Sequence, residues 1–226
     1  MARERGHLEE SALPSTPVRL VLTVSMLCLS AGASAATTES TESGQIVPVA
    51  VGQPAPAFSA VDENGARRRL GDYRGDYVVL EWVNRACPFV QKHYDSDNMQ
   101  ALQNDARARG VVWLTVSSTA PGHPGYMDAE GAERFRTRYD AMPTSILIDP
   151  DGRMARLYDV EVTPQVFIID PRGVLIYMGG MDDRPTTRVG DIDGAIDFVG
   201  NAIDQALAER PIEHPVTRAY GCPVVY

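Results

Sequence analysis

The sequence predicts an α/β fold in which helices cover both faces of a central mixed sheet. Apolar runs of strand length alternate with amphipathic segments of helix length through the middle of the chain, and a hairpin followed by a helix comes near its end. The 226 residues are enough for one good core and, once a leader is removed, for one domain.

The charge of the chain limits its partners. The formal net charge is -9, so a phosphate backbone or an anionic membrane surface would repel the protein. We therefore expect no nucleic-acid partner. The balance of 44% hydrophobic and 23% charged residues is that of an ordinary globular protein.

The N-terminus predicts export. The apolar run Leu20–Ser30 has the length of a signal-peptide core and is shorter than the ~20 residues of a spanning helix. Ala33 and Ala35 then supply an A-x-A cleavage pattern. We predict a signal peptide over residues 1–35, a periplasmic or secreted protein, and no stable membrane span in the mature form. An uncleaved anchor is the alternative.

Cleavage changes the cysteine count. Of the three cysteines, Cys28 lies in the predicted leader, which leaves Cys87 and Cys222. Two cysteines in an exported chain are a disulfide candidate, because disulfides persist in oxidising compartments.

Composition divides the mature chain into three parts. Residues 36–46 are small and polar and predict a flexible lead-in, residues 47–210 carry the strand and helix signals of one domain, and residues 211–226 form an irregular tail that contains Cys222.

The first half of the domain predicts a hairpin, a strand and a helix. "DENG" at Asp62–Gly65 is a turn signal, and Tyr77–Val83 reads as a buried strand. A helix follows with Pro88 at its first position, where the missing N–H costs nothing. We expect it to break around Asp95–Asn98 and to resume as far as Gly110.

The second half predicts further alternation. Val111–Val116 is a continuous apolar run that fits a central strand, and Ala129–Tyr139 is a charged surface helix. "SILIDPDG" and "VFIIDPRG" each read as a strand that ends in a D-P-x-G turn, and we expect these two strands to be adjacent, with a short helix between them in sequence.

A strand and a helix follow. "VLIYMG" predicts the strand, and Asp191–Ala208 predicts the helix. Apolar residues recur along this helix at helical spacing, which predicts a face packed in the core. They are Ile192, Ala195, Ile196, Val199, Ile203 and Leu207.

The order of the motifs carries a family resemblance. "VGQPAPAF", "CPFVQKHY", "VTPQVFIID", "LIYMGGMDD" and the tail "YGC" follow one another as in the redoxin branch of the thioredoxin fold. The chain resembles the alkyl hydroperoxide reductase and thiol-specific antioxidant superfamily, in its peroxiredoxin-like group, over roughly residues 50–226. The resemblance implies a thioredoxin-like three-layer fold and a thiol-based oxidoreductase that uses redox-active cysteines with no other cofactor and no metal.

The resemblance also implies the site. Cys87 would be the nucleophile and Cys222 the resolving or structural partner. Pro164 would be a cis-proline that presents the backbone of Thr163 beside Cys87, where a substrate strand can pair. The candidate site residues are Cys87, Cys222, Pro164, Thr163, Asn84, Arg85 and Trp82.

Three departures from the family pattern leave the substrate open. Val90 replaces the second cysteine of a C-x-x-C motif, and Asn84 stands where peroxiredoxins have a threonine. Pro164 occupies the place of their peroxide-holding arginine, for which Arg85 is a possible substitute. The substrate is therefore a peroxide or a disulfide, and an external thiol would be the electron donor.

The local chemistry favours an activated thiol. A cysteine just before a helix receives backbone N–H groups and the positive end of the helix dipole, which lowers a thiol pKa by up to about 1.5 units. Arg85, if it points inward, would add to this effect. Glu81 would oppose it unless it accepts a proton.

Two other classes compete with the enzyme. A copper(I) chaperone on the same fold would use Cys87, Cys222 and His93 as soft ligands. A redox-silent module would keep Cys87 and Cys222 as a purely structural disulfide. His93 is otherwise a packed or solvated histidine.

Overall fold

The computed structural model describes residues 49–226. The predicted signal peptide, its cleavage site, Cys28 and the lead-in at residues 36–46 lie outside the described residues.

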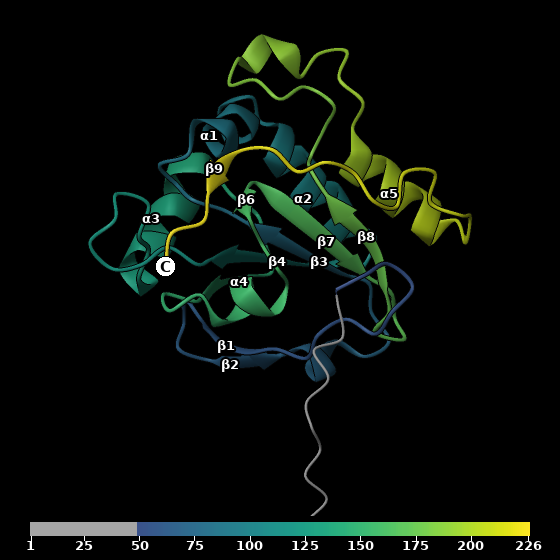
Figure 1. Ribbon diagram of the computed structural model, residues 1–226, viewed down its shortest axis with the longest axis horizontal. Coiled ribbons are helices and arrows are strands. Elements are labelled where there is room, and N and C mark those ends of the chain that lie inside the picture. The colour runs from purple at the N-terminus through teal and green to yellow at the C-terminus, as the bar shows by residue number, and fades with distance from the viewer. Residues whose placement is uncertain (1–48) are drawn as a thin grey trace, which may run out of the picture. The chain divides into compact units, whose positions relative to one another are not determined.

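The described chain forms one seven-stranded sheet and one two-stranded sheet (Figure 1). The large sheet has the order β2-β1-β5-β4-β3-β7-β8 and the small one pairs β6 with β9. The strands are β1 (Ser59–Asp62), β2 (Arg67–Arg69), β3 (Val78–Trp82), β4 (Val112–Ser117), β5 (Ser145–Ile148), β6 (Val162–Thr163), β7 (Gln165–Ile169), β8 (Leu175–Gly179) and β9 (Cys222–Pro223).

Helices connect these strands. The α-helices are α1 (Pro88–Asp95), α2 (Asn98–Ala108), α3 (Ala129–Tyr139), α4 (Arg153–Leu157) and α5 (Phe198–Leu207). Two short 3-10 helices are η1 (Leu70–Tyr73) and η2 (Val189–Asp191).

The large sheet is mixed. β3, β4 and β5 run parallel, whereas β1, β2, β7 and β8 pair antiparallel to their neighbours. The predicted mixed sheet is thus confirmed, and the hairpin turn predicted at Asp62–Gly65 joins β1 to β2.

Each face of the sheet has its own apolar core, because successive strand residues point to opposite faces. Val79, Trp113 and Ile168 face α1, α2, α3 and α5. Leu80 and Phe167 face α4 and η1. The three layers predicted from sequence are therefore present, with four helices on one face.

The central segment follows the prediction closely. β3, the start of α1 at Pro88, the break after Asp95 and the strand β4 all lie within about one residue of their predicted bounds. The interruption has Asp97 in the left-handed region with φ 59°, which separates α1 from α2.

Two expectations are wrong. The strands of the two D-P-x-G units, β5 and β7, are not adjacent, because β4 and β3 lie between them. The last helix begins at Phe198 and not at Asp191, since Asp197 caps it by accepting a hydrogen bond from the Gly200 N–H. Ile196, assigned from sequence to the core, is 45% exposed.

Candidate active site

Cys87 lies at the junction of β3 and α1, as its sequence context predicts. It is the N-cap residue of α1, with an extended backbone, and Pro88 follows at the first helical position. The Cys87 carbonyl accepts hydrogen bonds from the N–H groups of Val90 and Gln91, at 3.0 and 2.9 Å. The Cys87 side chain is 1% exposed.

Cys87 and Cys222 form a disulfide. Their Cα atoms are 5.8 Å apart although 135 positions separate them in sequence. Cys222 reaches this place because β9 pairs antiparallel with β6, with Cys222 opposite Thr163 and Pro223 opposite Val162. The disulfide candidate taken from the cysteine count is therefore present in the structure.

The backbone of Thr163 borders the sulfur of Cys87. The Thr163–Pro164 peptide bond is cis, as the resemblance implies. The Thr163 carbonyl oxygen lies 3.2 Å from the Cys87 sulfur. In reduced protein with this geometry the thiol donates to that carbonyl, which favours the protonated form and opposes the helix dipole.

The expected hydrogen bond from the helix to the sulfur is absent from this disulfide form. The Cys87 side chain accepts no capping bond from α1. The N–H groups of Val90 and Gln91 donate to the Cys87 carbonyl oxygen, and not to its sulfur.

The tail approaches the site closely only because position 221 is a glycine. A Cβ at Gly221 would lie 1.9 Å from the Thr163 carbonyl oxygen, and its φ of +153° disfavours other residues. Beyond the disulfide, the Val224 N–H donates to the Glu161 carbonyl at 3.0 Å.

Glu81 is fully buried on the face of β3 that carries α1 and α2. Tyr94 donates to one of its carboxyl oxygens at 2.8 Å, and Gln103, Trp113 and Thr115 donate to the other at 3.2, 2.8 and 2.8 Å. Burial raises the pKa of Glu81, and these donors partly offset the rise. None of these hydrogen bonds reaches Cys87.

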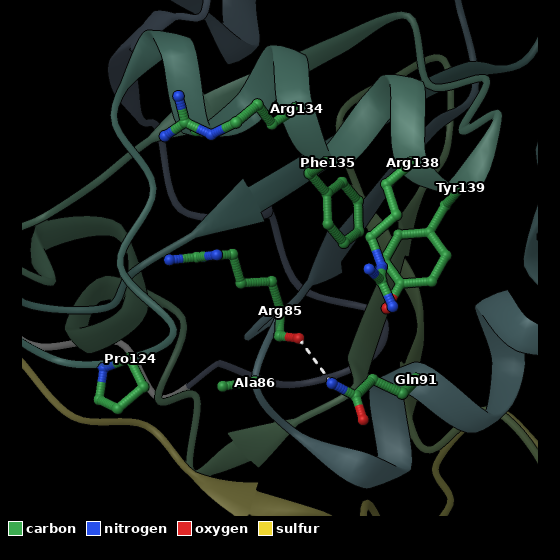
Figure 2. A pocket seen from close by; sticks show the side chains of 9 residues that line it. Arg85, Ala86, Gln91, Pro124, Arg134, Phe135, Arg138 and Tyr139 are labelled. Atoms are coloured by element: carbon green, nitrogen blue, oxygen red, sulfur yellow. Dashed lines mark hydrogen bonds between the residues drawn. The ribbon is translucent and has the colours of Figure 1, made fainter.

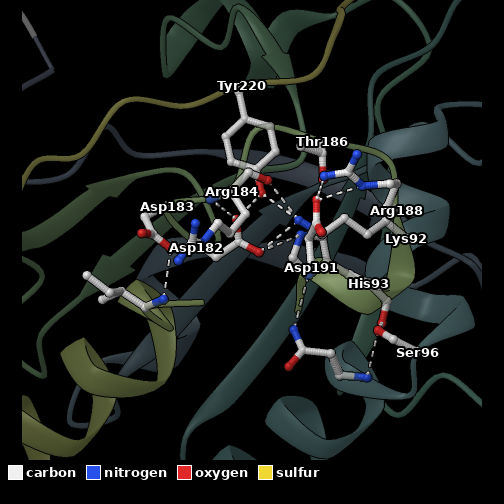
Figure 3. Close-up of polar contacts among 12 residues, drawn as sticks. Lys92, His93, Ser96, Asp182, Asp183, Arg184, Thr186, Arg188, Asp191 and Tyr220 are labelled. Atoms are coloured by element: carbon white, nitrogen blue, oxygen red, sulfur yellow. Dashed lines mark hydrogen bonds and ion pairs between the residues drawn. The ribbon is translucent and has the colours of Figure 1, made fainter. Parts of the chain in front are cut away.

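A buried polar cluster fixes the tail beside α1 (Figure 3). The Lys92 ammonium donates to Asp182 at 3.0 Å and to the Arg184 carbonyl at 2.8 Å. Tyr220, two residues before Cys222, donates to the same Asp182 carboxylate. His93 lies next to the Lys92–Asp182 ion pair, with its Nε2 3.8 Å from the Asp182 carboxylate. Burial lowers the pKa of His93 to about 4, so its ring is neutral at pH 7.

Sequence reasoning missed Lys92, Asp182 and Tyr220. Lys92 is completely buried on a short helix, and its partners lie 90 and 128 positions away. No local pattern marks such a long-range cluster. The position of Tyr220 beside Cys222 is the nearest signal, since any residue that fixes the tail must lie close to that cysteine.

The remaining candidate residues lie around the loop before α1. Asn84 accepts a hydrogen bond from the Ala86 N–H at 2.9 Å. Trp82 is buried on the opposite face of the sheet from α1, and its indole N–H donates to Ser118 at 3.0 Å. Arg85 is exposed and donates to the Tyr126 carbonyl at 3.0 Å, so its side chain does not point inward to Cys87.

The copper ligand set is not assembled. Cys87 and Cys222 are bonded to each other, while the His93 ring contacts Asn98 at 3.1 Å and faces Asp182. Within residues 49–226, no group of three or more His, Cys, Asp or Glu side chains is placed to hold a metal ion. In the same residues, no helix has both the length and the apolar character needed to cross a bilayer.

Fold and site together define a thioredoxin-fold redoxin, with a cysteine at a helix start facing a cis-proline. Residues 51–178 match the family model described as AhpC/TSA family. The chain belongs to the AhpC/TSA family.

Curated relatives are similar over half of the chain. The thiol-disulfide oxidoreductase ResA of Geobacillus kaustophilus is 31% identical over 120 residues, which are 53% of this chain and 63% of that protein. The protein of the same name from Bacillus subtilis is 25% identical over 128 residues, 51% of this chain and 70% of that one. The alignment thus leaves more than a third of the Geobacillus relative uncovered.

Two solved structures share the fold. An uncharacterized conserved protein from Geobacillus kaustophilus has a TM-score of 0.66 at 24% identity, over 79% of this chain and 93% of its own. The hypothetical protein SMc02350 from Sinorhizobium meliloti 1021 has a TM-score of 0.65 at 20% identity, over 79% and 95%. The thioredoxin-like fold predicted from the motifs is confirmed.

Proposed function

We propose that the protein is an exported thiol-disulfide oxidoreductase in which Cys87 is the nucleophile and Cys222 is the resolving cysteine. The observation that carries the proposal is the disulfide between the N-cap of α1 and the strand beside the cis-proline. The curated relatives named thiol-disulfide oxidoreductase support the same reaction.

The reaction proceeds by two exchanges. The Cys87 thiolate attacks one sulfur of a substrate disulfide, forms a mixed disulfide and releases one substrate thiol. The Cys222 thiolate then attacks the Cys87 sulfur and releases the second substrate thiol. Two electrons pass from the protein to the substrate, and an external thiol returns them by the reverse exchanges.

Neighbouring residues would position the substrate. Thr163 and Pro164 border the Cys87 sulfur, so a substrate disulfide that reaches Cys87 would lie against their backbone. Asn84 would hold the shape of the loop before Cys87 through its hydrogen bond with the Ala86 N–H, and Arg85 would anchor that loop to the Tyr126 carbonyl. Trp82 would fix the end of β3 from the opposite face of the sheet, where it packs against aromatic rings.

Export is part of the proposal. The apolar run Leu20–Ser30 and the A-x-A pattern at Ala33 and Ala35 support a leader. A disulfide that closes a long loop is favoured in an oxidising compartment.

A peroxide is the less favoured substrate. Pro164 occupies the place of the peroxide-holding arginine, and the Arg85 guanidinium is engaged by the Tyr126 carbonyl. Thiolate attack on a peroxide would still need a donor to polarise the peroxide bond.

The test is steady-state turnover of hydroxyethyl disulfide and of hydrogen peroxide with a thiol donor, each with Cys87→Ser and Cys222→Ser. We expect disulfide turnover that is abolished in Cys87→Ser. In Cys222→Ser we expect a mixed disulfide at Cys87, which mass spectrometry of the intact protein detects.

Two outcomes contradict the proposal. If Cys87 in the reduced protein resists alkylation at neutral pH, the disulfide is purely structural. If hydrogen peroxide is consumed faster than the disulfide and Cys87→Ser abolishes that reaction, the protein is a peroxidase.

A further inference from the structure

A cavity of about 580 Å³ opens between the loop before α1 and helix α3 (Figure 2). Arg85 and Gln91 form one wall, and α3 contributes the other. Figure 2 shows Phe135, Arg138 and Tyr139 pointing from α3 toward the side where Gln91 lies, whereas Arg134 extends along the helix. The α3 residues that line it are Arg134, Phe135, Arg138 and Tyr139.

Positive charge gathers in this cavity although the chain as a whole is acidic. Three arginines line it and no Asp or Glu does, in a protein of net charge -9. Arg134 pairs with Glu130, but the two side chains are 60% and 83% exposed, so solvent weakens the pair. Within residues 49–226 neither Arg85 nor Arg138 forms an ion pair. An anion in the cavity would find guanidinium groups that no carboxylate of the described residues neutralises at Arg85 and Arg138.

The residue types indicate a carboxylate. A guanidinium presents paired N–H donors that match the two oxygens of a carboxylate. The Gln91 amide adds a neutral polar group, and the largely buried Phe135 adds an apolar ring to the lining. The volume falls in the range of about 300–1,000 Å³ that small-molecule sites have.

The cavity borders the segment that carries the nucleophile, while Cys87 itself is buried and is not among the lining residues. Ala86, which lines it, directly precedes Cys87, and adjacent Cα atoms lie about 3.8 Å apart. Gln91 follows one helical turn later, with its backbone N–H bonded to the Cys87 carbonyl at 2.9 Å and its side chain to the Arg85 carbonyl at 3.0 Å. A molecule held in the cavity therefore has its remaining atoms within a few ångströms of the segment that carries Cys87.

We propose that this cavity binds the carboxylates of a low-molecular-weight anionic disulfide and so selects the substrate of Cys87. The inference rests on the proposed function. The Cys87 thiolate attacks the ligand disulfide RS–SR, giving Cys87–S–SR and RS⁻. Cys222 thiolate then displaces the second RS⁻, so that the ligand is reduced to two thiols as Cys87 and Cys222 are oxidised.

Binding is tested without chemistry. Calorimetric titration of S-methylglutathione, a dicarboxylate that cannot exchange, into Cys87→Ser should show saturable binding. Arg134→Gln and Arg138→Gln in that background should each weaken it about tenfold, the size of one charge-assisted hydrogen bond. Arg67→Gln removes an exposed arginine from β2 at the far edge of the sheet and should leave the affinity unchanged. Absence of binding, or equal affinity in all three variants, overturns the proposal.

Selectivity is tested with three disulfides of different charge. The reduced protein should react faster with anionic glutathione disulfide than with neutral hydroxyethyl disulfide, and slowest with cationic cystamine. Arg138→Gln should lower the ratio of the first two rates about tenfold, whereas Arg67→Gln should preserve it. Added salt should lower the same ratio.

The two proposals fail in different ways. If none of the three disulfides reacts with Cys87, the proposed function fails. If all three react at the same rate and S-methylglutathione does not bind, the function stands and the anionic ligand is wrong.

Discussion

The imidazole of His93 is buried and neutral, and it lies next to the ion pair between Lys92 and Asp182. Its Nδ1 contacts the Asn98 amide at 3.1 Å, and its Nε2 has no hydrogen-bond partner. Burial is the main reason that its pKa falls to about 4; Asp182 acts against this shift and Lys92 adds to it. A second cation is not favoured here, because Lys92 already neutralises Asp182.

Protonation of His93 should therefore couple to stability. Between the usual pKa of 6.5 and the folded pKa of about 4, the unfolded chain binds a proton that the folded chain does not. The free energy of unfolding should then fall as pH falls, by about 2 kcal/mol from pH 7 to pH 5 for this group. Urea unfolding of wild type and His93→Asn at pH 7 and at pH 5 measures this change in the free energy of unfolding. The variant should lack this loss.

The comparison isolates His93 because other titrating groups are common to both proteins. The raised pKa of Glu81 gives the opposite slope, since stability from a raised carboxyl pKa is lost as pH rises. That contribution cancels in the difference. Identical pH dependence in the two proteins would show that His93 is protonated equally in the folded and unfolded chains.

Among the elements, β9 depends on one glycine. This strand has two residues, and its approach to β6 leaves no space for a Cβ at Gly221. The pairing of Thr163 with Cys222 is what brings the second sulfur to Cys87. The pairing of β9 with β6 therefore places Cys222 for disulfide formation.

Gly221→Ala should separate β9 from β6. The new Cβ meets a backbone oxygen, which cannot rotate away, and the φ of +153° is unfavourable for alanine. We expect the equilibrium constant for Cys87–Cys222 formation to fall about tenfold or more, measured by thiol alkylation in glutathione redox buffers. Gly71→Ala, where a Cβ meets nothing within 4 Å, is the control. An unchanged constant in Gly221→Ala would mean that the tail closes without this pairing.

Elements that follow local patterns were predictable, and those set by distant partners were not. The apolar run and Pro88 located β3 and α1, since both signals lie inside the segment. The start of α5 was misplaced because Ile192 and Ile196 have helical spacing, whereas the cap at Asp197 decides where the helix begins. The sequence of a single strand does not indicate which strands lie next to it in the sheet. The expectation that β5 and β7 are neighbours is wrong for this reason.

The same reasoning applies to the site. Cys87 and Pro164 were found from motifs, and Cys222 from the cysteine count. The pairing of β6 with β9 and the contact of Tyr220 with Lys92 and Asp182 could not be found, because each joins segments about 40 to 130 positions apart with no repeated pattern.

At the scale of the molecule, the tail is tied to the domain by more than its disulfide. The Thr217 N–H donates to the Met178 carbonyl at 3.0 Å, and the Ala120 N–H donates to the Val225 carbonyl at 2.8 Å. Figure 1 shows the tail running from α5 past β8 to β9 and ending near α3 and α4. These contacts lie on both sides of Cys222, so we expect Cys222 to stay near Cys87 after reduction.

If the tail stays in place in the reduced folded protein, the disulfide stabilises the fold mainly by lowering the conformational entropy of the unfolded chain. It joins residues 135 positions apart, and closing a loop of that length stabilises the folded protein by about 5 kcal/mol in the chain-entropy model. Urea unfolding should show that difference between oxidised and reduced wild type, with Cys222→Ser matching the reduced protein. By the same thermodynamic cycle, the disulfide should be about 10³- to 10⁴-fold harder to reduce in the folded chain than in the unfolded one. A much smaller difference in stability would mean that the tail leaves the domain when the disulfide is reduced. The folded protein would then also gain conformational entropy on reduction, which would offset the entropy gained by the unfolded chain.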